Sequence, residues 1–143
     1  IGFAKALVLA EERRRSEVGR LGQLRQLLKK YLAEHLTDVR FNESDNNSPA
    51  ILNISLAGVD GERVVFALDE LGVQVATGSA CAANKGRRSH VLLAMGRTEA
   101  EVDGSLRLSL GRPTTEDDIV QAGELIVRTV KEQGKFGVAG YGT

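Results

Sequence analysis

The chain has 143 residues, of which 42% are hydrophobic and 27% charged, and both figures are typical of one globular domain. Its 19 basic residues balance 19 acidic ones, there is no tryptophan, and aromatic residues make up only 4%. These values argue against a protein that binds nucleic acid or an anionic membrane through bulk charge or base stacking. The sequence also has no run of the roughly 18 apolar residues that a membrane-spanning helix needs.

The cysteine and histidine content limits the chemistry further. Cys81 is the single cysteine, so no internal disulfide can form. Together with His35 and His90 it has no spacing typical of zinc ligands, and we expect no metal site. A free thiol suits a reducing compartment, and we therefore expect a cytoplasmic protein. The sequence opens on Ile1 rather than methionine, which we interpret as the start of a piece of a longer polypeptide.

The first 36 residues predict one long amphipathic helix, which would link this domain to a preceding one. Leucines recur at helical spacing in its second half, at Leu21, Leu24, Leu28, Leu32 and Leu36. Gly19 and Gly22 predict a weak point or a bend. The first half has a poorer apolar stripe and would be covered better by a neighbouring domain. Its triple arginine, 13–15, is more often a solvated face than a binding site.

Further elements follow from periodicity and capping residues. Strands are predicted at 39–41, 51–56, 73–76 and 106–110. Helices are predicted at 61–72, with Val64, Val65, Leu68 and Leu71 facing inward, at 89–95, at a short segment opened by Thr98 and Glu101, and at a final segment opened by Thr115 and Asp118. Gly72 and Gly96 would end the first two helices.

This order predicts an α+β fold in a single domain, 1–143. We expect a small mixed or antiparallel sheet of about four strands, covered by helices. Residues 77–88 have no apolar period and are predicted to form a mobile loop that carries Cys81. The glycine-rich residues 135–143 are predicted to form a loose tail.

Cys81 is the first candidate for chemistry. Cysteine is often a small buried hydrophobe, but the neighbours of Cys81 are small residues that give little bulk to bury it. Lys85, Arg87 and Arg88 follow closely, and nearby cations favour the nucleophilic thiolate. From local chemistry alone, a reactive thiol and a buried inert one remain equal alternatives.

Arg107 is the second candidate, inside a strand and on the face opposite Leu106 and Leu108. Most strand arginines face water, and the alternative is a fixed guanidinium that binds a substrate carboxylate through two parallel hydrogen bonds. Asn53 and Ser55 alternate in the same way; they could line a polar cleft, although solvent exposure is the simpler interpretation. His90 could serve acid–base chemistry, with a packing role as the alternative.

Three blocks of sequence resemble cysteine desulfurases. Ala76-Thr77-Gly78-Ser79-Ala80-Cys81, followed by a basic loop and Ser89-His90-Val91-Leu92-Leu93-Ala94-Met95-Gly96, resembles the active-site segment of that family. Leu106-Arg107-Leu108-Ser109-Leu110-Gly111-Arg112-Pro113-Thr114-Thr115 resembles the strand after it, and Ser48-Pro49-Ala50-Ile51-Leu52-Asn53-Ile54-Ser55-Leu56 an earlier strand. The long segment after Cys81 resembles the group with an extended catalytic loop, which serves iron–sulfur-cluster assembly.

The resemblance implies the small C-terminal domain of a class V aminotransferase that uses pyridoxal phosphate. In that family L-cysteine condenses with the cofactor, an enzyme thiolate attacks the substrate sulfur, alanine leaves, and the resulting persulfide passes to an acceptor. By position, Cys81 corresponds to the thiolate and Arg107 to the residue that pairs with the substrate carboxylate. The implied partners are a large cofactor-binding domain, a sulfur acceptor or iron–sulfur scaffold protein, and a second copy in a homodimer.

The sequence departs from the family in two ways. Ala82 and Ala83 stand where hydroxyl residues are usual, and the following loop is unusually cationic, so the acceptor stays open. None of the six lysines has the Ser-His-Lys setting of the cofactor lysine. We therefore expect the isolated chain to bind no cofactor and to be inactive. The alternatives are a stand-alone sulfur carrier or redox-sensing module, and an interaction domain whose cysteine is incidental.

Overall fold

The structure is a computed structural model that describes residues 1–77 and 88–137. Its elements follow the predicted order. They are α1 (Gly2–His35), β1 (Val39–Phe41), β2 (Ile51–Leu56), α2 (Gly61–Glu70), β3 (Ala76–Thr77), α4 (His90–Ala94), α5 (Glu99–Asp103), β4 (Ser105–Ser109) and α6 (Glu116–Gly137). Among the helices of these two ranges, we find none with the length and hydropathy to cross a membrane.

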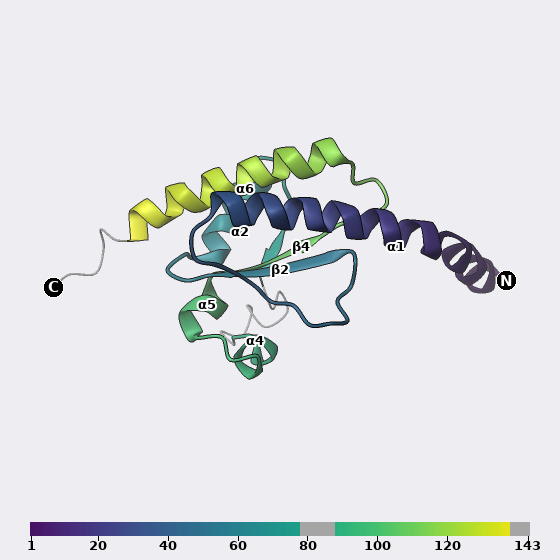
Figure 1. Ribbon diagram of the computed structural model, residues 1–143, viewed down its shortest axis with the longest axis horizontal. Helices are drawn as coiled ribbons and strands as arrows, with labels where there is room; N and C mark the ends of the chain where they lie inside the picture. Colours follow the sequence, from purple (N-terminus) through teal and green to yellow (C-terminus); the bar gives the residue numbers. More distant parts are fainter. Residues whose placement is uncertain (78–87, 138–143) are drawn as a thin grey trace.

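One four-stranded sheet in the order β1-β2-β4-β3 organises the fold. All three strand pairs are antiparallel, so the expected α+β architecture is confirmed and the sheet is antiparallel rather than mixed. Helices α1, α2 and α6 lie on one side of the sheet, and the short helices α4 and α5 lie on the other (Figure 1). The sheet therefore separates a large helical layer from a small one.

The main core lies between the sheet and the large helical layer. Alternate strand residues point into it because side chains along a strand alternate between faces. Leu52, Ile54 and Leu106 are fully buried there. The apolar stripes of the helices close the core, with Leu24, Leu28 and Leu32 from α1, Val64 and Leu68 from α2, and Ile119, Ile126, Val127 and Val130 from α6. The periodicity of the sequence predicted the stripes of α1 and α2.

Helix α1 runs without interruption through Gly19 and Gly22, so the helix does not break there. Its buried residues, Leu24, Arg25, Leu28 and Leu32, all lie in the second half. In the first half Phe3 is 79% exposed and Leu7 55% exposed. The first half thus extends beyond the body of the domain, as Figure 1 shows at the N-terminus.

The predicted helix boundaries rest on caps that the structure contains. Thr98 and Glu101 form a reciprocal capping box at α5, and the Ser89 side chain accepts from the Leu92 N–H at α4. Thr115 and Asp118 exchange the same pair of bonds at the start of α6. Gly72 and Gly96 have φ of 81° and 77°, the left-handed conformation that ends a helix at glycine.

Four details differ from prediction. The third strand contains only Ala76–Thr77, because Val73 N–H still bonds to Leu68 O and closes the end of α2. Leu71 is 44% exposed rather than inward, since it lies at the cap beyond the last turn of the helix. Strand β4 runs from Ser105 to Ser109, so it begins and ends one residue earlier than predicted. Helix α6 continues to Gly137, so residues 135–137 of the expected tail are helical.

Candidate functional site

A row of polar residues crosses the sheet on the face turned away from α1 and α6. Asn53 on β2 is the direct cross-strand partner of Arg107 on β4, and Arg107 is in turn the partner of Ala76 on β3. Direct partners project from the same face of a sheet. Arg107 therefore lies between an amide and a small methyl group, at the centre of this face.

Rigid neighbours on both sides hold the strand that carries Arg107. Leu106 is fully buried and Leu108 is 4% exposed, so both anchor β4 in the core. Arg107 itself is half-buried. The backbone position of the guanidinium is thus fixed while its side chain still reaches the open face, which is the arrangement expected of a binding arginine.

Asn42 connects this row to α4 through a hydrogen-bond network. Its Nδ2 donates to Asn53 Oδ1 at 2.6 Å and to Ser55 Oγ at 2.9 Å. Arg97 Nε donates to Asn42 Oδ1 at 2.5 Å. Ser55 is fully buried, so its predicted solvent exposure is wrong, and Asn53 is half-buried.

Cys81 lies outside the described residues, between two anchored ends. On one side Thr77 pairs with Leu106 in the sheet. On the other side Arg88 binds Asp103 with two hydrogen bonds, of 2.7 and 2.8 Å, and lies 2.9 Å from a Glu99 oxygen. Hydrogen bonding from Arg88 lowers the pKa of Asp103 more than burial raises it. Arg88 is thereby paired with carboxylates of α5.

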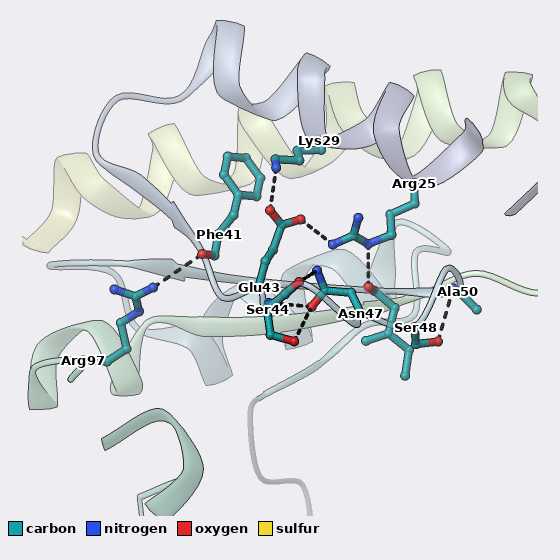
Figure 2. Close-up of polar contacts among 10 residues, drawn as sticks. Arg25, Lys29, Phe41, Glu43, Ser44, Asn47, Ser48, Ala50 and Arg97 are labelled. Carbon is teal, nitrogen blue, oxygen red and sulfur yellow. Dashed lines mark hydrogen bonds and ion pairs between the residues drawn. The ribbon is translucent and has the colours of Figure 1, made fainter. Parts of the chain in front are cut away.

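The segment 42–50 is held from the opposite side by α1 (Figure 2). Arg25, only 6% exposed, donates to Ile51 O at 2.8 Å and pairs with Glu43, and Lys29 Nζ lies 2.5 Å from the other Glu43 oxygen. Burial raises the pKa of Glu43, but the hydrogen bonds from Lys29 and Arg25 outweigh it and the net pKa is lowered. Glu43 is therefore the ionised centre of a two-cation cluster.

The remaining candidates do not join this site. His90 is exposed at the first turn of α4. His35 stacks on Tyr31 with ring centroids 4.2 Å apart and hydrogen-bonds to its carbonyl, so its contacts are with its own helix. A pocket of about 400 Å³ lies beside α6 and includes Leu108, Val75 and Ile119 in its wall. Because Leu108 faces the core, this pocket lies on the side of the sheet opposite Arg107.

Comparison with known proteins identifies the family. Residues 1–121 match the sequence model of the family described as aminotransferase class-V. The chain belongs to this family. Curated relatives carry a more specific name. The cysteine desulfurase IscS of Clostridium botulinum is 36% identical over 93% of this chain, and that of Klebsiella pneumoniae is 37% identical over 91%.

The aligned region is only a part of each relative. It accounts for 34% of the Clostridium protein and 32% of the Klebsiella protein, so this chain spans about a third of their length. The fold matches a solved NifS-like protein with a TM-score of 0.76 and 22% identity, over 90% of this chain and 32% of that one. The NifS-like protein of Rickettsia africae gives a TM-score of 0.74 at 24% identity, over 94% and 33%.

Sequence reasoning missed Asn42 and Arg97. Asn42 is the first residue of a stretch dense in turn formers, and Arg97 simply follows the glycine that ends α4. Neither residue lies in a periodic pattern. Their contact joins positions 55 residues apart, and no local signal in the sequence predicts it.

Proposed function

We propose that this chain is the C-terminal domain of a pyridoxal-phosphate-dependent cysteine desulfurase and that Cys81 and Arg107 are its share of the active site. The observation that carries this proposal is the match of 93% of the chain to cysteine desulfurases at 36% identity. The position of Arg107 supports it, because the strand β3 beside Arg107 leads into the segment of Cys81 within four residues.

The reaction of Cys81 is a sulfur transfer. The thiolate of Cys81 attacks the sulfur of L-cysteine, the bond from that sulfur to the substrate β-carbon breaks, and the β-carbon takes up a proton. The products are L-alanine and a persulfide on Cys81, so all atoms are accounted for without an external oxidant. Two cations close in sequence, Lys85 and Arg87, favour the thiolate over the thiol, whereas Arg88 is paired with Asp103 and Glu99.

Arg107 binds the substrate carboxylate in this proposal. A planar guanidinium matches a carboxylate with two parallel hydrogen bonds, and a strand anchored by Leu106 and Leu108 keeps it in place. Thr77 is paired with Leu106, and the four residues from Thr77 to Cys81 can span at most about 14 Å. That reach is compatible with a thiol that meets a substrate held at Arg107.

The described residues do not fit pyridoxal phosphate by themselves. The cofactor would supply the electron sink that weakens the carbon–sulfur bond, and it needs a lysine. Lys29 is paired with Glu43 and Lys30 lies 3.9 Å from Glu34. Lys5 and Lys131 are exposed. These four lysines lie on α1 or α6, across the sheet from Arg107 (Figure 1). We therefore assign the cofactor to the two-thirds of the relatives that this chain does not span, and expect the isolated chain to be inactive.

The same assignment covers the partners. We propose a cytoplasmic homodimer whose persulfide passes to a sulfur acceptor or iron–sulfur scaffold protein. A stand-alone sulfur carrier or redox-sensing module is the alternative. It would need the thiol but not a binding site for substrate, so it leaves the half-buried Arg107 without a role.

Persulfide trapping tests the proposal. Full-length protein that includes the cofactor-binding domain is given L-cysteine, and intact mass is measured after the thiols are blocked. We expect a gain of one sulfur atom on wild type and none on Cys81→Ser, while cofactor absorbance is unchanged. A normal persulfide yield in Cys81→Ser would refute the assignment. Loading of the isolated 143-residue chain directly from L-cysteine would refute the need for a second domain.

A further inference from the structure

The hydrogen-bond network around Asn42 has a defined direction. An arginine guanidinium can only donate, so the Asn42 atom that meets Arg97 Nε must be its oxygen. The amide nitrogen of Asn42 then points the other way and donates to Asn53 at 2.6 Å. The Asn53 atom that receives this bond must in turn be its oxygen. Arg97 thereby fixes the orientation of both amides.

This direction leaves the Asn53 amide nitrogen as a donor beside Arg107. Asn53 O accepts from Asn42 N on the β1 side, and Ala50 O accepts from Leu110 N on the β4 side. Hydrogen-bonded and non-hydrogen-bonded pairs alternate along an antiparallel ladder, and Ala50–Leu110 is a hydrogen-bonded pair. Asn53 and Arg107, three positions further along, are therefore a non-hydrogen-bonded pair. In such pairs the Cα atoms lie about 4.5 Å apart and the side chains are closest. Within the described ranges, only the oxygen of the Asn53 amide is engaged by a protein group.

The residues that set this orientation are themselves held in place. Gly96 N–H bonds to Leu93 O and Arg97 N–H bonds to Leu92 O, the paired closure that ends a helix at glycine. Arg97 is thus fixed to the end of α4 and also donates to Phe41 O, as Figure 2 shows. On the sheet, the fully buried Ser55 accepts the second Nδ2 bond of Asn42.

We propose that Asn53 donates a hydrogen bond to the carboxylate of the substrate alongside Arg107, and that Asn42 and Arg97 are positioning residues for its amide. The inference rests on the proposed function, because that function places the carboxylate at Arg107. A carboxylate offers about four acceptor positions, so a bidentate guanidinium leaves room for one more donor. The Asn53 amide is the adjacent side chain whose donor end faces the right way.

Asn53→Asp is the first test, because it removes the donor and adds a negative charge without changing the size of the side chain. The oxygen that accepts from Asn42 remains, while the amide nitrogen becomes a second carboxylate oxygen that repels the substrate and attracts Arg107. In the full-length enzyme we expect the KM for L-cysteine to rise by about 10- to 100-fold, the loss of a hydrogen bond to a charged group. A KM within about twofold of wild type would overturn the proposal.

Asn42→Asp tests the positioning without altering Asn53. The introduced carboxylate still accepts from Arg97 but has no N–H, so the Asn53 amide must rotate to donate to it, and the Asn53 oxygen then faces the substrate. We expect KM to rise as it does for Asn53→Asp, and the double variant to add little further because both changes remove one interaction. A double variant whose KM rises by the product of the two single effects would rule out positioning of Asn53 by Asn42.

Asn47→Asp is the matched control. It is the same chemical change at an exposed residue whose amide contacts only Ser44 among the described residues. We expect its KM to equal that of wild type, and an equal rise would show a non-specific effect of charge and overturn the proposal. Different outcomes refute the proposed function and the role of Asn53. A full-length wild type that forms no persulfide from L-cysteine refutes the desulfurase, and persulfide formation by Cys81→Ser refutes the role of Cys81. An active wild type with an unaffected Asn53→Asp refutes only the second donor.

Discussion

The two faces of the sheet are built from alternate residues of the same strands, yet they have opposite character. On β2 and β4 the residues that face α1 and α6 are leucine and isoleucine, each with at most 4% exposure. On the other face Asn53 and Arg107 are half-buried and Ser109 is exposed, whereas the pair Ser55 and Ser105 at one end of this face is buried. The covered face is closed by helices of this chain, while the open face presents donors that a ligand could engage.

Because the two faces differ, substitutions in a single strand can change either the free energy of unfolding or ligand binding. A residue on the covered face affects the free energy of unfolding, since its side chain is packed on all sides. A residue on the open face affects ligand binding with little effect on unfolding, because it loses less contact when truncated. Neighbouring positions in one strand can thus be used as probes of different properties.

Leu106→Ala should give the largest effect on stability. Leu106 is fully buried in the centre of the sheet, and its truncation leaves a cavity in the core. We expect a loss of about 2–5 kcal/mol in the free energy of unfolding, measured by urea denaturation. The matched control, Ser109→Ala in the same strand on the exposed face, should stay within about 0.5 kcal/mol. Equal losses for the two variants would contradict the contrast between the faces.

Arg107→Ala should show the reverse pattern. We expect turnover of L-cysteine in the full-length enzyme, measured as kcat/KM, to fall by the equivalent of about 1.5–3 kcal/mol, because a charged hydrogen-bond pair is lost. The unfolding free energy of the domain should change by no more than about 0.5 kcal/mol. Unchanged kinetics would refute the carboxylate role, and a large loss of stability would place Arg107 in the core instead.

Gly104→Ala probes how closely α5 approaches the sheet. A Cβ on Gly104 would lie 1.9 Å from Leu56 O, a backbone atom that cannot move aside. We expect a loss of about 1–3 kcal/mol in the free energy of unfolding from overpacking. Gly19→Ala is the control, since nothing lies within 4 Å of its added Cβ and it is inside α1. That change should stabilise the domain by up to about 1 kcal/mol.

Glu43→Gln should give the smallest effect and a distinctive pH dependence. The folded pKa of Glu43 is lowered, so its contribution is fully present above the unfolded pKa of about 4.3 and is lost as pH falls through the folded value. We expect Glu43→Gln to cost about 1 kcal/mol at pH 7, because the cluster is partly hydrated. The difference from wild type in urea denaturation should vanish in acid, and a constant difference across pH would exclude the ion pair.

The fold was largely predictable because its signals are local. Leucines at helical spacing located α1, and alternation located β2 and β4. The capping pairs Thr98–Glu101 and Thr115–Asp118 located the starts of two helices. The strand at 73–76 was predicted to start too early, because the alternation Val73-Gln74-Val75 looks the same whether it pairs with a strand or only follows the end of a helix.

The candidate site was only half predictable. Arg107 could be found because an arginine interrupts an apolar alternation, and its sequence block resembles a known family. Asn53 was found by the same alternation, but its bonds through Asn42 to Arg97 could not be, since they depend on the pairing of strands and on the position of Arg97 after α4. Ser55 was misjudged for the same reason: alternation predicts which face a residue is on but not what covers that face.

Asn42 and Glu43 are neighbours in sequence that serve opposite sides of the domain. Glu43 forms ion pairs with Arg25 and Lys29 of α1, and Asn42 donates to the Asn53 amide beside Arg107. The contacts of α1 and those of the proposed ligand site are therefore made by adjacent residues of the chain. A domain or partner that tilts the 34-residue helix α1 would move Glu43 through its two ion pairs, and the adjoining Asn42 and the Asn53 amide would shift with it.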